Sequence, residues 1–151
     1  MPQAEGTPGL KIRKAKRTDA ARIAELCGEL GYPSTPQQVE KRWLRLMPRS
    51  KHMVFVAEAP GPYVVGWVHV SVASLLECDR RAEVNGLIVA ERHRSSGAGA
   101  KLLAAAEKWA RECSCQAVNV RSNVIRERAH KFYERQGYEH YKTQKAFRKP
   151  L

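Results

Sequence analysis

Apolar residues along this chain recur at intervals of three and four in some segments and alternate or cluster in others, which separates helices from strands. Helical spacing is clear before Gly31 and again between Thr35 and Pro48. Glycine tolerates the left-handed conformation that ends a helix, and a proline soon after it prevents the helix from continuing. The first third of the chain predicts a strand at Leu10–Arg13, a helix that opens at Thr18 and ends at Gly31, and a helix with Ser34 or Thr35 as its cap and Pro36 as its first residue.

The rest of the chain alternates between strand and helix patterns. The turn Ala59–Pro62 joins two apolar runs and predicts a hairpin. The expected elements are strands at Met53–Glu58, Tyr63–Val72 and Ala82–Val89, a helix at Ala98–Arg111, a strand at Ala117–Arg121, a helix at Arg126–Gln136 that Gly137 ends, and one or two strands within Tyr138–Phe147. No linker divides them, so we expect one domain at residues 10–151 after a loose tail at residues 1–9.

Composition narrows the class of protein. A chain of 151 residues with 43% hydrophobic residues suits one globular domain with a core. No apolar run approaches the length of a membrane span, and the first nine residues lack the apolar segment of a secretory signal, so we expect a cytoplasmic protein. The four cysteines fit reduced thiols, and Cys113 and Cys115 lack partner ligands at metal spacing, so we expect no metal site.

The net charge of +12 is concentrated at the two ends of the chain. Residues 1–50 carry ten Lys and Arg against five Asp and Glu, residues 51–100 carry five of each, and residues 101–151 carry twelve against five. Such a balance favours acidic partners such as nucleotide phosphates or nucleic acid. Aromatic residues are not interleaved with the basic runs and no DNA-binding motif is present, so we do not expect nucleic acid as the main partner.

The segment Arg94-Ser95-Ser96-Gly97-Ala98-Gly99 lies between a predicted strand and a predicted helix. A tight glycine turn at this place points successive backbone N–H groups at one spot, and the helix dipole adds positive potential there. Phosphate oxygen is the natural ligand, although such a turn also begins many helices that bind nothing. No Gly-Lys-Ser or Gly-Lys-Thr closes the segment, so it is not the P-loop of nucleotide triphosphatases.

Two motifs together resemble the GNAT N-acetyltransferase superfamily. The first is Arg94-x-x-Gly97-x-Gly99, and the second is Ala129 followed by Phe132-Tyr133 and Gly137-Tyr138 in the later helix. The order of elements agrees over nearly the whole chain. The resemblance implies an α+β fold, a single GNAT-type domain whose central mixed β-sheet is flanked by helices on both faces. It also implies acetyl-CoA as cosubstrate and an amine as acceptor. The segments Ala82–Leu87 and Ser122–Glu139 are similar to the aminoalkylphosphonate N-acetyltransferases, except that Gly86 replaces an acidic residue.

The resemblance assigns the cofactor-binding residues. The turn amides would bind the pyrophosphate, with charge from Arg94, and the backbone of the preceding strand would pair with the pantetheine arm. The family's asparagine contact to pantetheine falls on Arg126 here, so Asn123 is a substitute candidate. Glycine usually follows the motif arginine, where this chain has serine. The implied contacts are Leu87, Ile88, Val89, Arg94, Ser95, Ser96, Gly97, Ala98, Gly99, Ala100, Asn123 and Arg126.

Direct attack of an amine on a thioester needs two proton transfers. The ammonium must lose a proton, and the departing thiolate, with a pKa near 8.5, is helped by gaining one. Glu83 is the candidate base because glutamate at this strand position acts so in part of the family; it is also able to be an ion-pair partner of Arg81. Tyr133 is the candidate acid because it matches the family tyrosine facing the sulfur. His130 lies three residues earlier, where a structural role is favoured over a proton relay.

The acceptor is the least determined part of the interpretation. Trp67 and His69 share one strand face and are candidates for the acceptor cleft, together with Tyr32 near the first helices; a core position for Trp67 fits equally well. A small amine is expected first and a protein lysine or N-terminus second. A CoA-binding sensor without turnover and a basic nucleic-acid-binding protein are the rival classes. Many family members are dimers, so a homodimer is left open.

Overall fold

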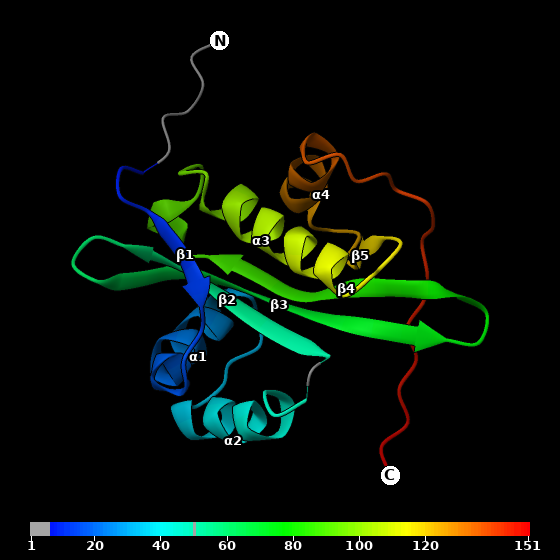
Figure 1. The fold of residues 1–151 in the computed structure, drawn as a ribbon, viewed down its shortest axis with the longest axis horizontal. Coiled ribbons are helices and arrows are strands. Elements are labelled where there is room, and N and C mark those ends of the chain that lie inside the picture. The colour runs from blue at the N-terminus through cyan, green and yellow to red at the C-terminus, as the bar shows by residue number, and fades with distance from the viewer. Residues whose placement is uncertain (1–6, 50) are drawn as a thin grey trace. The chain divides into compact units, whose positions relative to one another are not determined.

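The structure is a computed structural model that describes residues 7–49 and 51–151 (Figure 1). Most of the predicted N-terminal tail, residues 1–9, lies outside the described residues. The chain divides into two compact units, one that runs to Val120 and one from Arg121 to Leu151. The first unit contains the sheet and three of the four helices, and the second contains the last helix and the C-terminal segment.

Five strands of the first unit form one sheet in the order in which they occur in the chain. Neighbouring strands run antiparallel, except that the last pair is parallel. The strands are β1 Lys11–Lys14, β2 His52–Ala59, β3 Tyr63–Leu75, β4 Cys78–Val89 and β5 Val118–Val120. The five strands predicted before residue 122 are confirmed, and β3 and β4 extend further than expected, as a hairpin that projects beyond the other strands (Figure 1).

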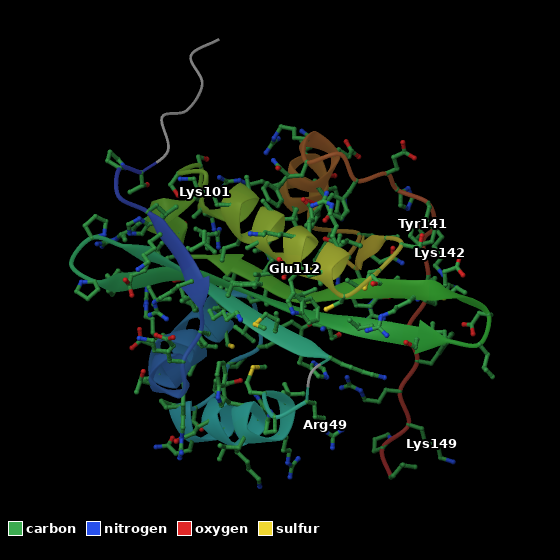
Figure 2. All side chains as sticks on the ribbon, viewed as in Figure 1. Arg49, Lys101, Glu112, Tyr141, Lys142 and Lys149 are labelled. Carbon is green, nitrogen blue, oxygen red and sulfur yellow. The ribbon has the colours of Figure 1, made fainter. Side chains whose placement is uncertain are left out.

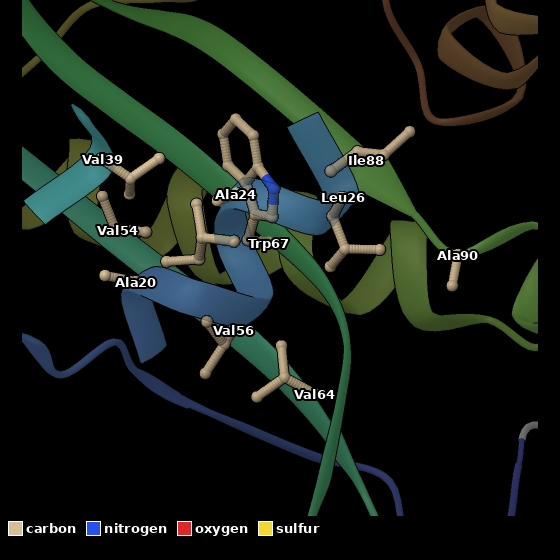
Figure 3. Packing of buried hydrophobic residues seen from close by; sticks show 11 residues of the cluster. Ala20, Ala24, Leu26, Val39, Val54, Val56, Val64, Trp67, Ile88 and Ala90 are labelled. Atoms are coloured by element: carbon tan, nitrogen blue, oxygen red, sulfur yellow. The ribbon is translucent and has the colours of Figure 1, made fainter. Parts of the chain in front are cut away.

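Helices cover both faces of the sheet, as the fold prediction required. Helices α1 (Ala20–Glu29) and α2 (Pro36–Leu46) lie on one face, and α3 (Ala98–Glu112) lies on the other (Figure 1). Buried side chains of α1, α2 and the central strands form one apolar cluster that includes Leu26, Val56 and Trp67 (Figure 3). Leu102 and Leu103 of α3 are fully buried on the opposite face. Burial of these side chains supplies most of the drive to fold.

The first two helices begin and end for identifiable reasons. Thr35 accepts a hydrogen bond from the Gln38 amide and is the cap of α2, which decides between the two predicted caps. Thr18 was expected to cap α1, and that prediction is wrong. A 3₁₀ turn at Arg17–Asp19 precedes the helix, and the Asp19 carboxylate accepts from the Lys16 amide and from the Arg13 guanidinium. The buried ion pair thus takes the place of the expected hydroxyl cap.

Strand β4 changes partners partway along its length. On the β3 side, Val70 faces Val84 while His69 faces Gly86, so Asn85 has no opposite residue and forms a bulge. On the other side, β5 pairs with Ala82–Val84 and with no further part of β4 among the described residues. The backbone edge of Leu87–Val89 on this side is therefore left without a strand partner.

The second unit contains α4, Glu127–Arg135, which ends at Gly137 in the left-handed conformation. The strands predicted within Tyr138–Phe147 are wrong, because residues 138–151 form no strand. Alternating side chains alone do not make a strand, since a strand is stabilised by backbone pairing with a neighbour that the local pattern does not specify. Tyr141 and Phe147 are mostly exposed, at 64% and 92%.

None of the helices in the described part of the chain is long and apolar enough to cross a membrane.

Candidate functional site

The glycine turn before α3 has the backbone that an anion site requires. Ser95 and Gly97 both have positive φ angles, of 68° and 85°. The family pattern has glycine where this chain has Ser95. Ser95 still takes the left-handed backbone conformation that glycine adopts freely, although serine adopts it at an energetic cost. Lys101, labelled in Figure 2, lies in the first turn of α3, the helix that follows the glycine turn.

Some of the turn amides are used within the protein and others are open. The Ser96 amide donates to His93, and the Ala98 amide makes a long bond of 3.4 Å to the Ser96 hydroxyl. The amides of Gly97, Gly99 and Ala100 donate to no acceptor in residues 7–49 and 51–151. Open N–H groups at the start of a 15-residue helix are the donors that bind phosphate.

Arg94 is tied to the elements on either side of the turn. Its Nε atom donates to the Val89 carbonyl at 3.3 Å, and its guanidinium lies 3.9 Å from the Glu29 carboxylate at the end of α1. The same carboxylate accepts from the Glu91 amide. Arg94 therefore begins the glycine turn with its side chain held between Val89 and Glu29, and its charge is partly offset by Glu29.

Polar side chains gather on the α1 and α2 face of the sheet, beyond the part that these helices cover. We call this set the polar floor. His52, Ser71 and Glu83 lie opposite one another on β2, β3 and β4, and residues that face each other across strands point to the same side. The polar floor consists of His52, His69, Ser71, Glu83 and Asn85.

Hydrogen bonds connect the polar floor in pairs. Asn85 Nδ2 donates to Ser71 Oγ at 2.8 Å, and Arg81 Nε donates to Glu83 Oε1 at 2.8 Å. The side chain of Glu83 is 14% exposed, so its carboxylate is largely sheltered but still reached from one side. The two roles expected for Glu83, general base and ion-pair partner of Arg81, are thus compatible. Arg81 Nε bonds Oε1 of the carboxylate, and the bond leaves Oε2 for another role.

Trp67 belongs to the apolar cluster (Figure 3) and lies on β3 two residues before His69 of the polar floor. Its ring packs so closely on Gly86 that a Cβ there would lie 2.7 Å from the ring. The glycine that departs from the family's acidic residue is therefore explained by packing against this tryptophan. The indole N–H is buried and has no acceptor among the described residues, which is an unusual cost for a core side chain.

His69 is held neutral by its surroundings. Burial, and then the neighbouring His52, lower the pKa of His69 to about 4. Burial, and then the charge of Arg49, also lower the pKa of His52. Arg49 lies at the end of the segment after α2, just before β2 (Figure 2).

This shift predicts how stability depends on pH. The unfolded chain takes up a proton on His69 near pH 6.5, whereas the folded chain does so near pH 4, so the stabilisation is complete above pH 6.5 and is lost as the pH falls towards 4. We expect the free energy of unfolding to fall by about 2–3 kcal/mol from this group over that range. Urea unfolding at several pH values measures it, and His69→Gln should flatten the dependence. Parallel curves for the two proteins would contradict the assignment.

In the second unit, Tyr133 is the centre of an aromatic cluster. Its ring makes edge contacts with Phe132 and Tyr138, at centroid distances of 5.3 Å and 5.9 Å. Burial raises the pKa of the Tyr133 phenol, and the charge of Arg126 offsets part of that effect. The hydroxyl therefore stays protonated over the ordinary pH range and is able to donate a proton.

The two candidates before α4 have local structural roles. Asn123 Oδ1 accepts from the Ile125 amide, and the Asn123 carbonyl accepts from the Arg126 amide and from His130 Nε2 at 2.8 Å. His130 is thus fixed as a donor to backbone, which favours the structural reading over a proton relay. The side-chain amide nitrogen of Asn123 and the exposed Arg126 guanidinium are the parts left for a ligand.

Sequence reasoning missed His52 and Ser71. Strand alternation places Asn85 on the face of Glu83, but sequence reasoning assigned no role to Asn85. The signal for these residues was available, since polar residues at every second position of a strand mark a face that is not core. The bulge at Asn85, after which Gly86 and Ile88 take that face in place of Leu87, has no such signal. Tyr32 is 72% exposed in the loop after α1, and the structure shows no contact between it and the polar floor.

The chain matches the model of the acetyltransferase (GNAT) family over residues 18–138. A curated relative is the uncharacterized N-acetyltransferase YhfO of Bacillus subtilis (strain 168), which is 27% identical over 134 residues, covering 86% of this chain and 90% of that protein.

Solved structures share the fold at lower identity. The aminoglycoside acetyltransferase AAC(6')-Iy, in complex with the bisubstrate analogue CoA-S-monomethyl-acetylneamine, has a TM-score of 0.82 at 18% identity, covering 94% of this chain and 99% of that one. Glucosamine-6-phosphate N-acetyltransferase from Arabidopsis thaliana has a TM-score of 0.78 at 20% identity, covering 92% and 97%. At such identity the likeness establishes the fold, and it confirms the predicted α+β architecture.

Proposed function

The chain belongs to the GNAT acetyltransferase family and is an acetyl-CoA-dependent N-acetyltransferase, and from this premise we propose that it acetylates the primary amine of a small molecule by direct attack. Glu83 is proposed as the general base and Tyr133 as the general acid. The observation that carries the proposal is the polar floor, which places a sheltered carboxylate on the open part of one sheet face.

The residues present fit the cosubstrate. The open amides of Gly97, Gly99 and Ala100, with Arg94 at the start of the same turn, supply donors and charge for a diphosphate. The unpaired edge of Leu87–Val89 supplies backbone groups for an extended arm that carries amides. When bound, acetyl-CoA supplies an acetyl group activated as a thioester.

Glu83 would remove the proton that prevents the amine from attacking. Arg81 holds Oε1, so Oε2 is the oxygen available to accept a proton from the ammonium, directly or through one water. The electron pair then stays on the amine nitrogen and forms the new bond to the acetyl carbon. Arg81 keeps the carboxylate in one orientation, which a base needs for proton transfer along a hydrogen bond.

Tyr133 would donate a proton to the sulfur of the departing thiolate. Its phenol is neutral and half-buried, so it is able to donate from Oη without first gaining a proton from water. The edge contacts with Phe132 and Tyr138 fix the ring. An acid whose pKa lies above that of the leaving thiol stays protonated until charge develops on the sulfur.

A small acceptor fits the polar floor better than a protein side chain does, because the floor offers separate polar groups on three neighbouring strands. The structure neighbours named above act on an aminoglycoside-type compound and an amino sugar phosphate, which supports the same class. Arg81 beside Glu83 is compatible with an acceptor that also carries an anionic group, such as an aminophosphonate.

A panel of amines with thiol release as readout tests the proposal. The panel contains aminophosphonates, amino sugars, aminoglycosides, polyamines and lysine-containing peptides, each with acetyl-CoA in excess. We expect thiol release above the hydrolysis background with at least one small amine, and weaker release with peptides. Turnover with peptides alone would replace the small acceptor by a protein, and binding of acetyl-CoA without any turnover would favour a sensor.

A further inference from the structure

Two histidines of the polar floor are bonded to each other, and the proton transfers proposed above use neither of them. His52 Nδ1 lies 3.0 Å from His69 Nε2, and the two ring centroids are 5.3 Å apart with the planes tilted by 30°. His52 is the first residue of β2 and is paired with Ser71 of β3. His69 lies two residues before Ser71 in β3, on the same face of the sheet. The bond therefore joins the rim of the polar floor to its interior.

Both rings stay neutral at ordinary pH, because burial lowers the pKa of each. The charge of Arg49, in the segment before β2, acts on His52, and the carboxylate of Glu83 lies on β4 opposite Ser71, where it is paired with Arg81. In a bond between two neutral imidazoles one nitrogen donates and the other accepts, so the bond ties the tautomers of the rings together. With Nε2 of His69 engaged, Nδ1 is its remaining polar atom, and no partner for Nδ1 is found in the described part of the chain.

We propose that, of the two tautomer pairs this bond allows, the protein adopts the one in which His69 Nε2 donates to His52 Nδ1, so that Nδ1 of His69 is a bare acceptor for an N–H group of the substrate amine. The inference rests on the proposed function, because it needs the amine to lie over the polar floor. Glu83 Oε2, opposite Ser71 on β4, and His69 Nδ1, two residues before Ser71 on β3, then receive two N–H groups of one ammonium. The opposite tautomer would present a donor to the ammonium, and a protonated ring would repel it.

The role is one of positioning. His69 gains no proton in the step, and the proton that leaves the amine goes to Glu83. The bare nitrogen holds one N–H group of the amine, so that a second N–H group is presented to the Glu83 carboxylate. His52 acts only through His69, because in this arrangement its Nδ1 accepts the hydrogen bond that the proton-bearing Nε2 of His69 donates.

The tautomer is measured directly by ¹⁵N NMR of the imidazole rings in the ligand-free protein at pH 7.5. We expect the protonated-nitrogen signal at Nε2 of His69 and the bare-nitrogen signal at Nδ1. Addition of an amine identified by the panel, with CoA present to prevent turnover, should shift the Nδ1 signal. A protonated Nδ1, or no shift at a saturating amine concentration, would overturn the proposal.

Substitutions separate the two nitrogens. His69→Gln places its amide near the Nε2 position and keeps a partner for His52, but it removes the acceptor at Nδ1. Loss of one hydrogen bond to a charged group should raise the KM for the amine by about 10- to 100-fold, with kcat changed much less. His69→Asn places its amide oxygen near the Nδ1 position and should restore part of the affinity. His140→Gln, in the second unit, is the matched control and should leave KM unchanged.

The outcomes distinguish this inference from the proposed function. If the panel finds a small amine and its KM is the same in wild type and His69→Gln, the positioning role fails while the acetyl transfer stands. If His69→Gln lowers kcat and leaves KM alone, His69 takes part in proton transfer and the proposal is wrong. If no amine is acetylated, the proposed acceptor class fails and takes this inference with it.

Discussion

Glu83→Gln should lower kcat/KM for the amine by about 10²- to 10⁴-fold at neutral pH, the range that general acid–base groups contribute. The glutamine side chain has nearly the same shape, and its amide oxygen is still able to accept from Arg81 as Glu83 Oε1 does. The change therefore removes proton acceptance at the second oxygen while it preserves the packing of β4.

The pH profile distinguishes a missing base from general damage. At low pH almost all of the amine carries a proton that Glu83 must take, so the deficit should be greatest there. Above the pKa of the amine the neutral form is already present in solution, and the variant should recover most of the wild-type rate. Initial rates over pH 6–10 test this expectation.

Glu77→Gln at the exposed tip of the β3–β4 hairpin is the matched control, because it removes a carboxylate from the same hairpin without touching the polar floor. It should behave as wild type at every pH. An equal loss of rate at all pH values in Glu83→Gln would mean that the carboxylate orients Arg81 or the acceptor and does not take the proton.

Local signals predicted most of the fold in advance. Glycine in the left-handed conformation ends α1 at Gly31 and α4 at Gly137, and the sequence marks both ends. The threonine cap and following proline mark the start of α2 in the same way. These features depend on residues within one helical turn of each other, so single-sequence reasoning reaches them.

Features that depend on distant residues were harder to predict. The opening of α1 is set by Asp19 and Arg13, which meet across a strand–helix boundary and not at a hydroxyl cap. The predicted strands within Tyr138–Phe147 failed because strand pairing is decided by a partner elsewhere in the chain. Propensity supplies a tendency in such segments, and tertiary contacts decide the outcome.

The residues of the candidate site also fall into two groups, those that a local motif marks and those that depend on strand pairing. The glycine turn and Tyr133 are contiguous motifs, so the sequence located them. The polar floor is built from three strands whose register the sequence does not specify, so His52 and Ser71, which lie on other strands than Glu83, were not found. Gly86 illustrates the point, because the sequence shows only a departure from the family, whereas the structure shows the tryptophan ring that requires it.

Tyr133→Phe should lower kcat by about 10²-fold or more while the affinity for acetyl-CoA changes little. The substitution removes one hydroxyl and keeps the ring, so the edge contacts with Phe132 and Tyr138 are retained. Acetyl-CoA should raise the melting temperature of wild type and variant alike, because a ligand that binds only the folded state stabilises it in proportion to occupancy. A lost shift in the variant would mean that the hydroxyl serves binding.

The leaving group supplies the decisive comparison for Tyr133. If the phenol donates to the departing sulfur, an acetyl thioester of a more acidic thiol needs that proton less, and the deficit of Tyr133→Phe should shrink with it. Tyr63→Phe, which removes a hydroxyl from an exposed ring stacked under Arg22, is the control and should show no such dependence. The same deficit with both thioesters would rule out proton donation to sulfur, since the step that the variant slows would then not involve the leaving group.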